Sequence, residues 1–387
     1  MYILMISRGI PSKDNPQWGC FERDQAEALV KFGHKVVVLS IDARFKRKRG
    51  TLGLHISSYK GVDYYNYVTI PAALISTIVG YDLYMSKVRN YYLRKVYKAI
   101  ESEFGKPDII YSHFFWNTCL AVKIKEQTGI PVVAIEHLAR FNESKLSKSD
   151  KKWSSFAFNH CDSLISVSDS LAISLKRHFG RTSRVIHNMY GSEFGFPVSS
   201  KIRETNSPIV FVSVASLVYR KGFDVLIKSF EKLNLPKEKW HLNIIGWGEE
   251  KDNLEQLIIN NGLQRNITLL GKKNKLEIAE ELRNSDVFVL PSRNENFSVS
   301  VLEGLSVGLP VLATDCGGIR ECINDDNGVI VPVDDVDKMS DAIRYFILNI
   351  EKYNKYNIAK DCANKFSDMA IAKLLTDEFN RVLFKAK

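Results

Sequence analysis

The chain has 387 residues, of which 45% are hydrophobic and 25% are charged, and its formal net charge is +10. This length is too great for one ordinary hydrophobic core and predicts two domains, and the balanced composition excludes an intrinsically disordered protein. The positive charge indicates an acidic partner or surface, but it does not distinguish nucleic acid, phospholipid and nucleotide phosphate.

Short apolar runs alternate with amphipathic segments throughout the first half of the chain. The runs suit strands that are buried on both faces, as in a parallel sheet. These strands span residues 2–7, 35–41, 108–113, 131–137 and 163–168. After the first of them, FERDQAEALVKFGH predicts a helix with Ala26, Leu29 and Val30 on one face and Gly33 at its end. The pattern is that of a doubly wound α/β domain.

The alternation breaks at residues 191–207, which are rich in Gly, Ser and Pro, and we expect a linker there. A second set of apolar runs follows and predicts another parallel sheet. These strands span residues 209–216, 241–246, 267–271, 286–291, 310–314 and 328–332. We therefore expect Rossmann-like domains over residues 1–190 and 208–365, and a final helix over residues 366–387 that packs on the N-terminal domain.

Two glutamates, Glu295 and Glu303, follow the apolar run DVFVLPS and stand among small and apolar residues. Ligands of open α/β sheets bind beyond the carboxyl ends of the strands, and a carboxylate in apolar surroundings needs a partner. Asn296 or Ser298 can cap a helix that begins here, and its free amides at residues 297–300 would suit a diphosphate. Glu303 would then receive two ribose hydroxyls, and Glu295 would face the other end of a nucleotide sugar. The alternative is that Glu303 complements the helix dipole and Glu295 is a solvated loop residue.

The residues around these glutamates resemble the family 4 retaining glycosyltransferases, which have the GT-B fold. The family's hallmark is two glutamates separated by seven residues, followed by a GLPVVAT-like strand and a Gly-Gly turn. Here Glu295-Asn296-Phe297-Ser298 leads to Glu303 and then to GLPVLATDCGGIRECI and NGVIVP. The resemblance covers nearly the whole chain. It implies two Rossmann-like, doubly wound parallel-sheet domains that face a central cleft, with the acceptor on the N-terminal domain and the nucleotide-sugar donor on the C-terminal one.

The resemblance also implies roles for single residues of the C-terminal domain. Glu295 would contact hydroxyls of the donor sugar, Glu303 would hold the ribose, and Lys221 would point at the diphosphate. The sequence departs from the family pattern at Ser216, where an arginine is usual, so that either Arg220 compensates or the site relies on Lys221 and the helix N-terminus. Glycines are usual in place of two further residues, Asn296 and Ser298. The donor-binding residues expected on this basis are Gly19, Ser216, Arg220, Lys221, Glu295, Asn296, Phe297, Ser298, Val299 and Glu303.

The N-terminal domain contributes a glycine and two histidines to this expectation. Gly19 lies in PQWGCFERDQAEAL, which is similar to the family's glycine-bearing loop that faces the diphosphate. His113 and His137 each end an apolar run, where acceptor and sugar contacts fall in relatives. A histidine in such a place is more often structural, and that alternative stays open. By the resemblance, we expect catalytic roles for Glu295, Lys221 and His137.

The function implied by the resemblance is transfer of a hexosyl or N-acetylhexosaminyl group with retention of its anomeric configuration. A UDP-sugar is favoured over a GDP-sugar, and the acceptor would be a glycan or a lipid-linked glycan of bacterial surface polysaccharide synthesis. The alternatives are a sugar-nucleotide epimerase and a GT-B binding subunit without catalysis. We expect no cofactor and no metal, because the DxD of residues 335–337 is typical of a helix cap.

Positive charge is concentrated in the N-terminal domain, at residues 87–98 and at Lys46, Arg47, Lys48 and Arg49. These residues predict contact with an anionic membrane surface rather than with nucleic acid, because no nucleic-acid-binding motif is present. A solvated basic face is the alternative. The six cysteines form no CxxC pair, which favours a reducing cytoplasm. Without a signal peptide or a run of about 18 apolar residues, we expect a cytoplasmic protein, peripheral on the inner face of the membrane.

Overall fold

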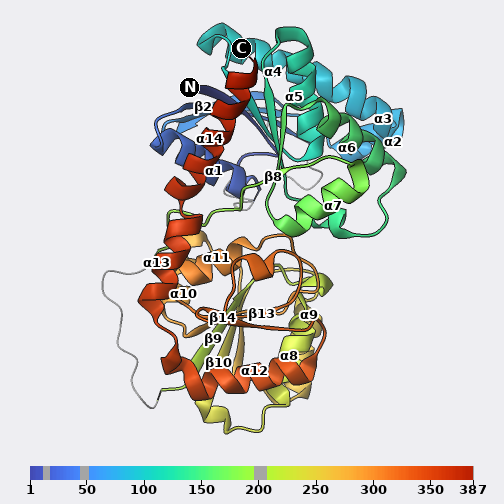
Figure 1. The fold of residues 1–387 in the computed structure, drawn as a ribbon. Coiled ribbons are helices and arrows are strands. Elements are labelled where there is room, and N and C mark those ends of the chain that lie inside the picture. Colours follow the sequence, from blue (N-terminus) through green and yellow to red (C-terminus); the bar gives the residue numbers. More distant parts are fainter. Residues whose placement is uncertain (12–17, 44–51, 196–206, 387) are drawn as a thin grey trace. The chain divides into compact units, whose positions relative to one another are not determined.

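The computed structural model describes residues 1–11, 18–43, 52–195 and 207–386. They form two compact units: unit 1 comprises Met1–His187 with Ile371–Lys387, and unit 2 comprises Asn188–Ala370. Each unit contains one sheet with helices on both of its faces (Figure 1). Most of the expected linker, residues 196–206, and the basic residues Lys46, Arg47, Lys48 and Arg49 lie outside the described residues.

Unit 1 is built on an eight-stranded sheet in the order β3-β4-β2-β1-β5-β6-β7-β8. Its strands are β1 (Tyr2–Ser7), β2 (Lys35–Asp42), β3 (Gly53–Tyr59), β4 (Val62–Val68), β5 (Ile109–His113), β6 (Val132–Glu136), β7 (Ser163–Ser166) and β8 (Arg184–Val185). All neighbouring strands pair in parallel except β3, which is antiparallel to β4 at the edge. The five strands predicted from apolar runs are therefore confirmed as β1, β2, β5, β6 and β7.

The hairpin of β3 and β4 was not predicted. Its turn is made by Lys60 and Gly61, which both have positive φ values, 48° and 77°. Strand β3 is exposed along nearly its whole length, so its sequence GLHISSY carries no continuous apolar run. An exposed edge strand of this kind lacks the signal that identifies a buried parallel strand.

The helices of unit 1 cover the sheet and include the C-terminal helix of the chain. They are α1 (Cys20–Lys31), α2 (Ala72–Val79), α3 (Tyr81–Leu83), α4 (Arg89–Phe104), α5 (Phe115–Thr128), α6 (Lys148–His160), α7 (Asp169–Phe179) and α14 (Asp368–Ala386). Helix α14 packs on this sheet through Phe379, whose ring lies 5.1 Å from that of Tyr111. Thr376 of the same helix is hydrogen-bonded to His34, at 2.8 Å.

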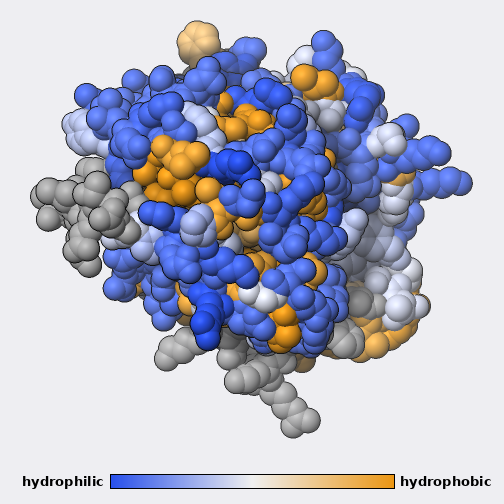
Figure 2. Space-filling view, turned by 90° about the horizontal axis from the view of Figure 1, so that it is seen from below, coloured by the Kyte–Doolittle hydropathy of each residue, from blue (hydrophilic) through white to orange (hydrophobic). Residues whose placement is uncertain are grey.

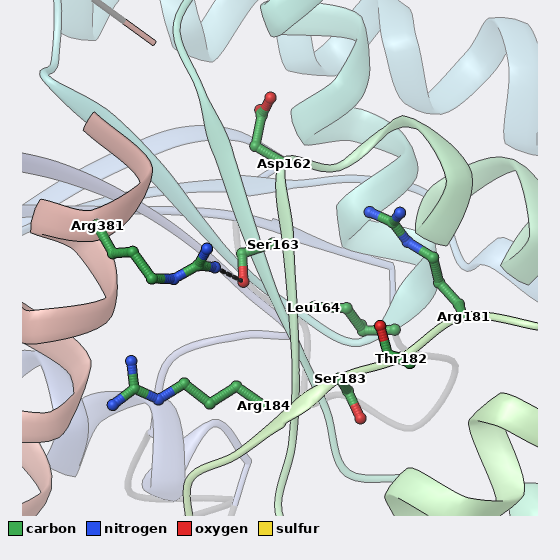
Figure 3. A pocket seen from close by; sticks show the side chains of 8 residues that line it. All are labelled: Asp162, Ser163, Leu164, Arg181, Thr182, Ser183, Arg184 and Arg381. Atoms are coloured by element: carbon green, nitrogen blue, oxygen red, sulfur yellow. Dashed lines mark hydrogen bonds between the residues drawn. The ribbon is translucent and has the colours of Figure 1, made fainter. Parts of the chain in front are cut away.

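A buried carboxylate fastens α14 to the edge of the sheet. Glu378 is fully buried and accepts hydrogen bonds from Ser163, Arg184 and Arg381. Figure 3 shows Arg381 of α14 reaching Ser163 at the start of β7, with Arg184 of β8 below it. Although burial opposes ionisation, the hydrogen bonds from these three residues hold the pKa of Glu378 at about 2.

Unit 2 is built on a six-stranded parallel sheet in the order β11-β10-β9-β12-β13-β14. Its strands are β9 (Ile209–Val214), β10 (Trp240–Ile245), β11 (Ile267–Gly271), β12 (Val287–Leu290), β13 (Val311–Thr314) and β14 (Gly328–Val331). All six were predicted as apolar runs, and the fold class of two doubly wound α/β units is confirmed. The chain winds outward from β9 to β11 and then returns to β12, so the order reverses between β9 and β12. Ligands of such sheets bind where the order reverses.

The helices of unit 2 pack on the two faces of this sheet. They are α8 (Phe223–Glu231), α9 (Lys251–Asn260), α10 (Lys275–Arg283), α11 (Val299–Ser306), α12 (Val336–Asn349) and α13 (Lys355–Phe366). Aromatic residues link strand and helix in the core: the ring of Phe230 lies 5.2 Å from Phe211 and 4.6 Å from Trp240. Between β10 and α9, Gly246 and Gly248 allow the chain to pass close to the backbone of Ala215 and Leu217.

The face of the molecule seen in Figure 2 is mostly hydrophilic, and its hydrophobic residues form separate patches. Within the described ranges, we find no helix that combines the length and the apolar character needed to cross a membrane.

Candidate functional site

The loops that follow β9 and β12 meet at the point where the strand order of unit 2 reverses. The loop after β9 contains a 3-10 turn, Tyr219–Lys221, and then Gly222, from which α8 starts. Gly222 has a φ of 67°, and a Cβ atom there would lie 2.0 Å from the carbonyl oxygen of Pro291, just after β12. Only glycine combines this backbone conformation with so close an approach. The two loops are thus held against each other beside Lys221.

Lys221 and Glu295 form an ion pair across these two loops. Their side chains are only 11% and 10% exposed. The carboxylate of Glu295 also accepts a hydrogen bond of 2.9 Å from the hydroxyl of Ser292. A cation and an anion that are both nearly buried must keep charged or hydrogen-bonding partners. These two residues, 74 positions apart in the sequence, therefore form the charged centre of the site.

The Gly-Gly turn predicted as part of the motif supports the loop that carries Glu295. Gly317 has a φ of 61°, and a Cβ atom there would lie 2.0 Å from the carbonyl oxygen of Glu295. The amide of Gly318 donates a hydrogen bond of 2.6 Å to the carbonyl oxygen of Asn296. The glycines of this turn thus allow a close backbone contact that holds the loop of Glu295 in place.

Helix α11 begins at Val299, as expected if Ser298 and not Asn296 precedes its first turn. Ser298 occupies the N-cap position, but within the described residues its side chain makes no capping hydrogen bond. Its hydroxyl instead lies 3.1 Å from the hydroxyl of Ser300. The expectation that a side chain caps this helix is therefore wrong for Ser298. The carbonyl oxygen of Phe297 accepts a hydrogen bond of 3.0 Å from the amide group of Asn188.

Of three other predicted donor residues in unit 2, one lies on α11 and two lie in the loop after β9. Glu303 is half-buried on the second turn of α11. Ser216 is exposed in the loop after β9. Arg220 is also exposed and donates a weak hydrogen bond of 3.4 Å to the carbonyl oxygen of Asn294, so its guanidinium lies on the same loop pair as Lys221.

In unit 1, the strand order reverses between β1 and β5, and the two predicted histidines lie at that end of the sheet. His113 ends β5 and His137 follows β6. Their rings stack with centroids 5.3 Å apart, and Nδ1 of His113 lies 3.2 Å from Nε2 of His137. Burial, with the neighbouring His137 and then Arg8, holds the pKa of His113 well below its usual range. No described residue pairs with Nε2 of His113.

A buried carboxylate that the sequence analysis missed holds the backbone beside His137. Glu136, the last residue of β6, is fully buried and accepts hydrogen bonds from the amides of His137, Leu138 and Phe115, at 2.7, 3.0 and 3.0 Å. Burial raises the pKa of Glu136 to about 7, although the amide hydrogen bonds oppose the rise. The sequence signal was a charged residue at the end of a buried strand, directly before His137.

The predicted glycine of unit 1 makes a similarly close contact. Gly19 has a φ of 77°, and a Cβ atom there would lie 2.1 Å from the carbonyl oxygen of Gly9. It directly precedes α1, without a side-chain cap among the described residues. Gly9 follows β1, so Gly19 belongs to the same end of the sheet as the histidines.

Two glycosyltransferase family models match the chain. Residues 198–360 match the model of the glycosyl transferases group 1, and residues 23–191 match that of glycosyltransferase family 4. The chain belongs to the family 4 glycosyltransferases. The two matches fall on the two halves of the chain and together include every predicted site residue except Gly19. The chain is therefore a glycosyltransferase that transfers sugar from a nucleotide sugar.

Individual relatives of this glycosyltransferase are distant. An uncharacterized glycosyltransferase from Methanocaldococcus jannaschii is 26% identical over 340 residues, which cover 86% of this chain and 90% of the relative. The amylovoran biosynthesis glycosyltransferase AmsK from Erwinia amylovora is 30% identical over 148 residues, 36% of each chain. The crystal structure of Anabaena HepE in complex with UDP-glucose matches with a TM-score of 0.73 and 15% identity, over 98% of this chain and 100% of that chain. The fold is GT-B.

The glycosyltransferase also contains an arginine at this site that the sequence analysis did not single out. Arg293, two residues before Glu295, pairs with both carboxylate oxygens of Asp224 at 2.9 and 2.8 Å and with Asp334 at 2.6 Å. The hydrogen bonds to Asp224 are the main reason that the pKa of Arg293 is raised. In the sequence, Arg293 stands out only as a charged residue between β12 and Glu295.

The predicted helix cap at the DxD sequence is confirmed. Asp335 accepts a hydrogen bond of 2.9 Å from the amide of Lys338 at the start of α12, and Asp337 pairs with Lys232. In the part of the chain that the structure describes, no group of three or more His, Cys, Asp or Glu residues is arranged to hold a metal ion.

Proposed function

We propose that this glycosyltransferase retains the anomeric configuration of its donor and transfers the sugar to a glycan or a lipid-linked glycan of bacterial surface polysaccharide synthesis. The observation that carries the proposal is the nearly buried pair of Lys221 and Glu295 where the strand order of unit 2 reverses. A UDP-sugar is the preferred donor in this proposal. The choice of a UDP-sugar is supported by the structural similarity to HepE in complex with UDP-glucose. The choice of acceptor is supported by the similarity to a glycosyltransferase of amylovoran biosynthesis.

Donor binding would exchange the partners of this ion pair. Lys221 would leave the carboxylate of Glu295 for the oxygens of the diphosphate, and Glu295 would accept hydrogen bonds from the hydroxyls of the sugar. A nucleotide sugar offers a replacement partner to both residues. Charge-assisted hydrogen bonds of this kind are among the strongest polar contacts in proteins. Glu303, on the second turn of α11, would accept the hydroxyls of the ribose.

In the transfer step, the bond between the anomeric carbon and the phosphate oxygen breaks. The new bond forms on the same face, from the acceptor hydroxyl to that carbon, and the hydroxyl proton passes to the departing phosphate oxygen. Negative charge grows on the diphosphate as the bond breaks. Once the donor is bound, Lys221 and the first amides of α11 would stabilise this charge without further reorganisation, because their loops hold both in place. No step in this scheme needs a metal ion.

Unit 1 would bind the acceptor through His113 and His137. The pKa of His113 is held low by burial, so its ring is neutral near pH 7 and offers one hydrogen-bond donor and one acceptor. Nε2 of His113 is buried and no described residue engages it, so it would pair with an acceptor hydroxyl that enters this end of the sheet. We propose Gly19, at the same end of the sheet, as a backbone contact to the donor diphosphate.

We also propose that unit 1 contacts an anionic membrane surface that carries the acceptor. Lys46, Arg47, Lys48 and Arg49 are the residues assigned to this contact. Among the described residues, Leu74 and Ile78 of α2 are 48% and 76% exposed, and α4 has exposed basic residues. Apolar and basic side chains together suit the interface of an anionic bilayer. All six cysteines are buried free thiols, which agrees with a cytoplasmic site of action.

The test is to incubate the pure protein with UDP-, GDP- and ADP-sugars, with and without lipid-linked glycan acceptors. We expect release of nucleoside diphosphate that depends on the acceptor. Isomerised donor without acceptor would identify an epimerase. Binding of the nucleotide without turnover under any condition would indicate a subunit that has lost catalysis, for which the serine at position 216 would be the first explanation.

A further inference from the structure

Arg293 joins three separate loops at the carboxyl ends of the strands of unit 2. It lies in the loop after β12 and pairs with Asp224 in the first turn of α8, which follows β9. Its Nε atom donates a hydrogen bond of 2.6 Å to Asp334, in the loop between β14 and α12. Its side chain is only 13% exposed.

The same guanidinium also holds the turn that carries Lys221. Nη1 of Arg293 donates a hydrogen bond of 2.6 Å to the carbonyl oxygen of Tyr219, and the guanidinium carbon lies 4.0 Å from the centre of the Tyr219 ring. The backbone amide of Arg293 donates a further hydrogen bond of 2.8 Å to the carbonyl oxygen of Arg220. Arg293 thus holds the two residues that directly precede Lys221.

This set of contacts needs the shape of an arginine. A planar guanidinium can donate in parallel to two carboxylate oxygens, and it has further donors in the same plane for a third and a fourth acceptor. A lysine keeps the charge but has one compact ammonium group and cannot make this fork. The contacts therefore depend on geometry as well as on charge.

We propose that Arg293 is a positioning residue, which fixes Lys221 opposite Glu295 so that the ammonium group meets the diphosphate of the donor in one geometry. The inference rests on the proposed function of this site. Lys221 follows the held turn directly, and Glu295 follows Arg293 by two residues. A rigid link between the two loops therefore determines the distance between the two charges. The backbone contact of Gly222 with Pro291 is the second link between these loops.

The experiment compares Arg293→Lys with wild type in turnover of the cognate nucleotide sugar. Misplacing a reacting group by about 1 Å costs on the order of 10²-fold in rate, so we expect kcat to fall roughly 10- to 100-fold. We expect a smaller change in the KM of the donor, since the charge on the diphosphate grows only during the reaction. Asp224→Asn removes the negative charge that pairs with Arg293 but leaves Arg293 unchanged. It should also lower kcat more than it changes the KM of the donor.

The matched control is Arg320→Lys. Arg320 forms a similar two-point pair with Asp315, at 2.8 and 2.7 Å, but its side chain is 67% exposed. Exposed pairs contribute little, so kcat and KM should stay at wild-type values.

A double-variant cycle separates positioning from a general structural role. If Arg293 acts through Lys221, Arg293→Lys should cause no further loss of kcat in a Lys221→Ala background. It should cause its full loss in a Glu303→Ala background. Equal losses in both backgrounds, or wild-type kcat in Arg293→Lys and Asp224→Asn, would overturn the inference while leaving the proposed function intact. Absence of turnover in the wild-type protein with every nucleotide sugar would overturn both.

Discussion

Replacing Lys221 by alanine is the most informative single change at the site. In the structure, its ammonium group pairs with Glu295 in surroundings that leave both side chains about one tenth exposed. Loss of one preorganised group that stabilises a developing oxyanion costs about 3–4 kcal/mol, or roughly 10²- to 10³-fold in kcat. The change also removes the ammonium group from a nearly buried carboxylate, which keeps its hydrogen bond from the hydroxyl of Ser292, and breaking a buried pair costs about 3 kcal/mol of folding stability.

The two effects can be measured separately. Steady-state turnover gives the loss in kcat, titration calorimetry gives the affinity for the nucleoside diphosphate, and thermal unfolding gives the stability. Glu295→Gln in the Lys221→Ala background should restore stability, because it removes a nearly buried charge that has lost its lysine, but it should not restore turnover. Lys228→Ala, an exposed lysine on α8, is the control and should change none of the three. Wild-type turnover and wild-type diphosphate affinity in Lys221→Ala would refute the assignment of the donor site.

Three further predictions concern other residues. Glu303→Ala should lower turnover about 10²-fold and weaken nucleotide binding, since it removes a charge-assisted contact to the ribose; kinetics and calorimetry measure both effects. Activity should survive EDTA, because Asp335 caps α12 and Asp337 pairs with Lys232; complete loss that Mn²⁺ restores would contradict this interpretation. The pKa of Glu378 is held at about 2, below its usual 4.5, so its contribution to stability is complete above pH 4.5 and is lost as the pH falls towards 2. Glu378→Gln should therefore cost about 2–3 kcal/mol at pH 7 and less as the pH falls to 2, as measured by denaturant unfolding.

The strands of both sheets could be predicted because a strand buried on both faces is a continuous apolar run. Strand β3 is exposed and partly polar, β4 has polar residues within VDYYNYV, and β8 has only two residues, so these three strands produced no such signal. Glu295 and Lys221 lie in loops after such runs, Glu303 lies on α11, and the roles of all three were expected from the resemblance to the family 4 glycosyltransferases. Their pairing was not predicted, since 74 residues separate Lys221 from Glu295 and only the order of the strands brings them together.

Arg293 and Glu136 were not predicted as site residues, because their contacts depend on the folded chain. The partners of Arg293 are Asp224 and Asp334, which are 69 and 41 residues away, so the pairing depends on the folded sheet. Glu136 acts through three backbone amides, one of which belongs to Phe115 after the neighbouring strand. Because almost every residue has a backbone amide, the sequence does not show which amides donate hydrogen bonds to Glu136. Ser298 shows the opposite case, in which a residue typical of a helix cap occupies that position and its hydroxyl lies beside another serine instead.

The most direct test of the central claim is a crystal structure with the nucleoside diphosphate that gives the largest thermal shift among UDP, GDP and ADP. The account predicts density for the nucleotide at the carboxyl ends of β9 and β12. The diphosphate should lie within hydrogen-bond distance of Nζ of Lys221, the ribose hydroxyls should contact Glu303, and the pair between Lys221 and Glu295 should be open. A nucleotide bound elsewhere in unit 2, with that ion pair intact, would contradict the account.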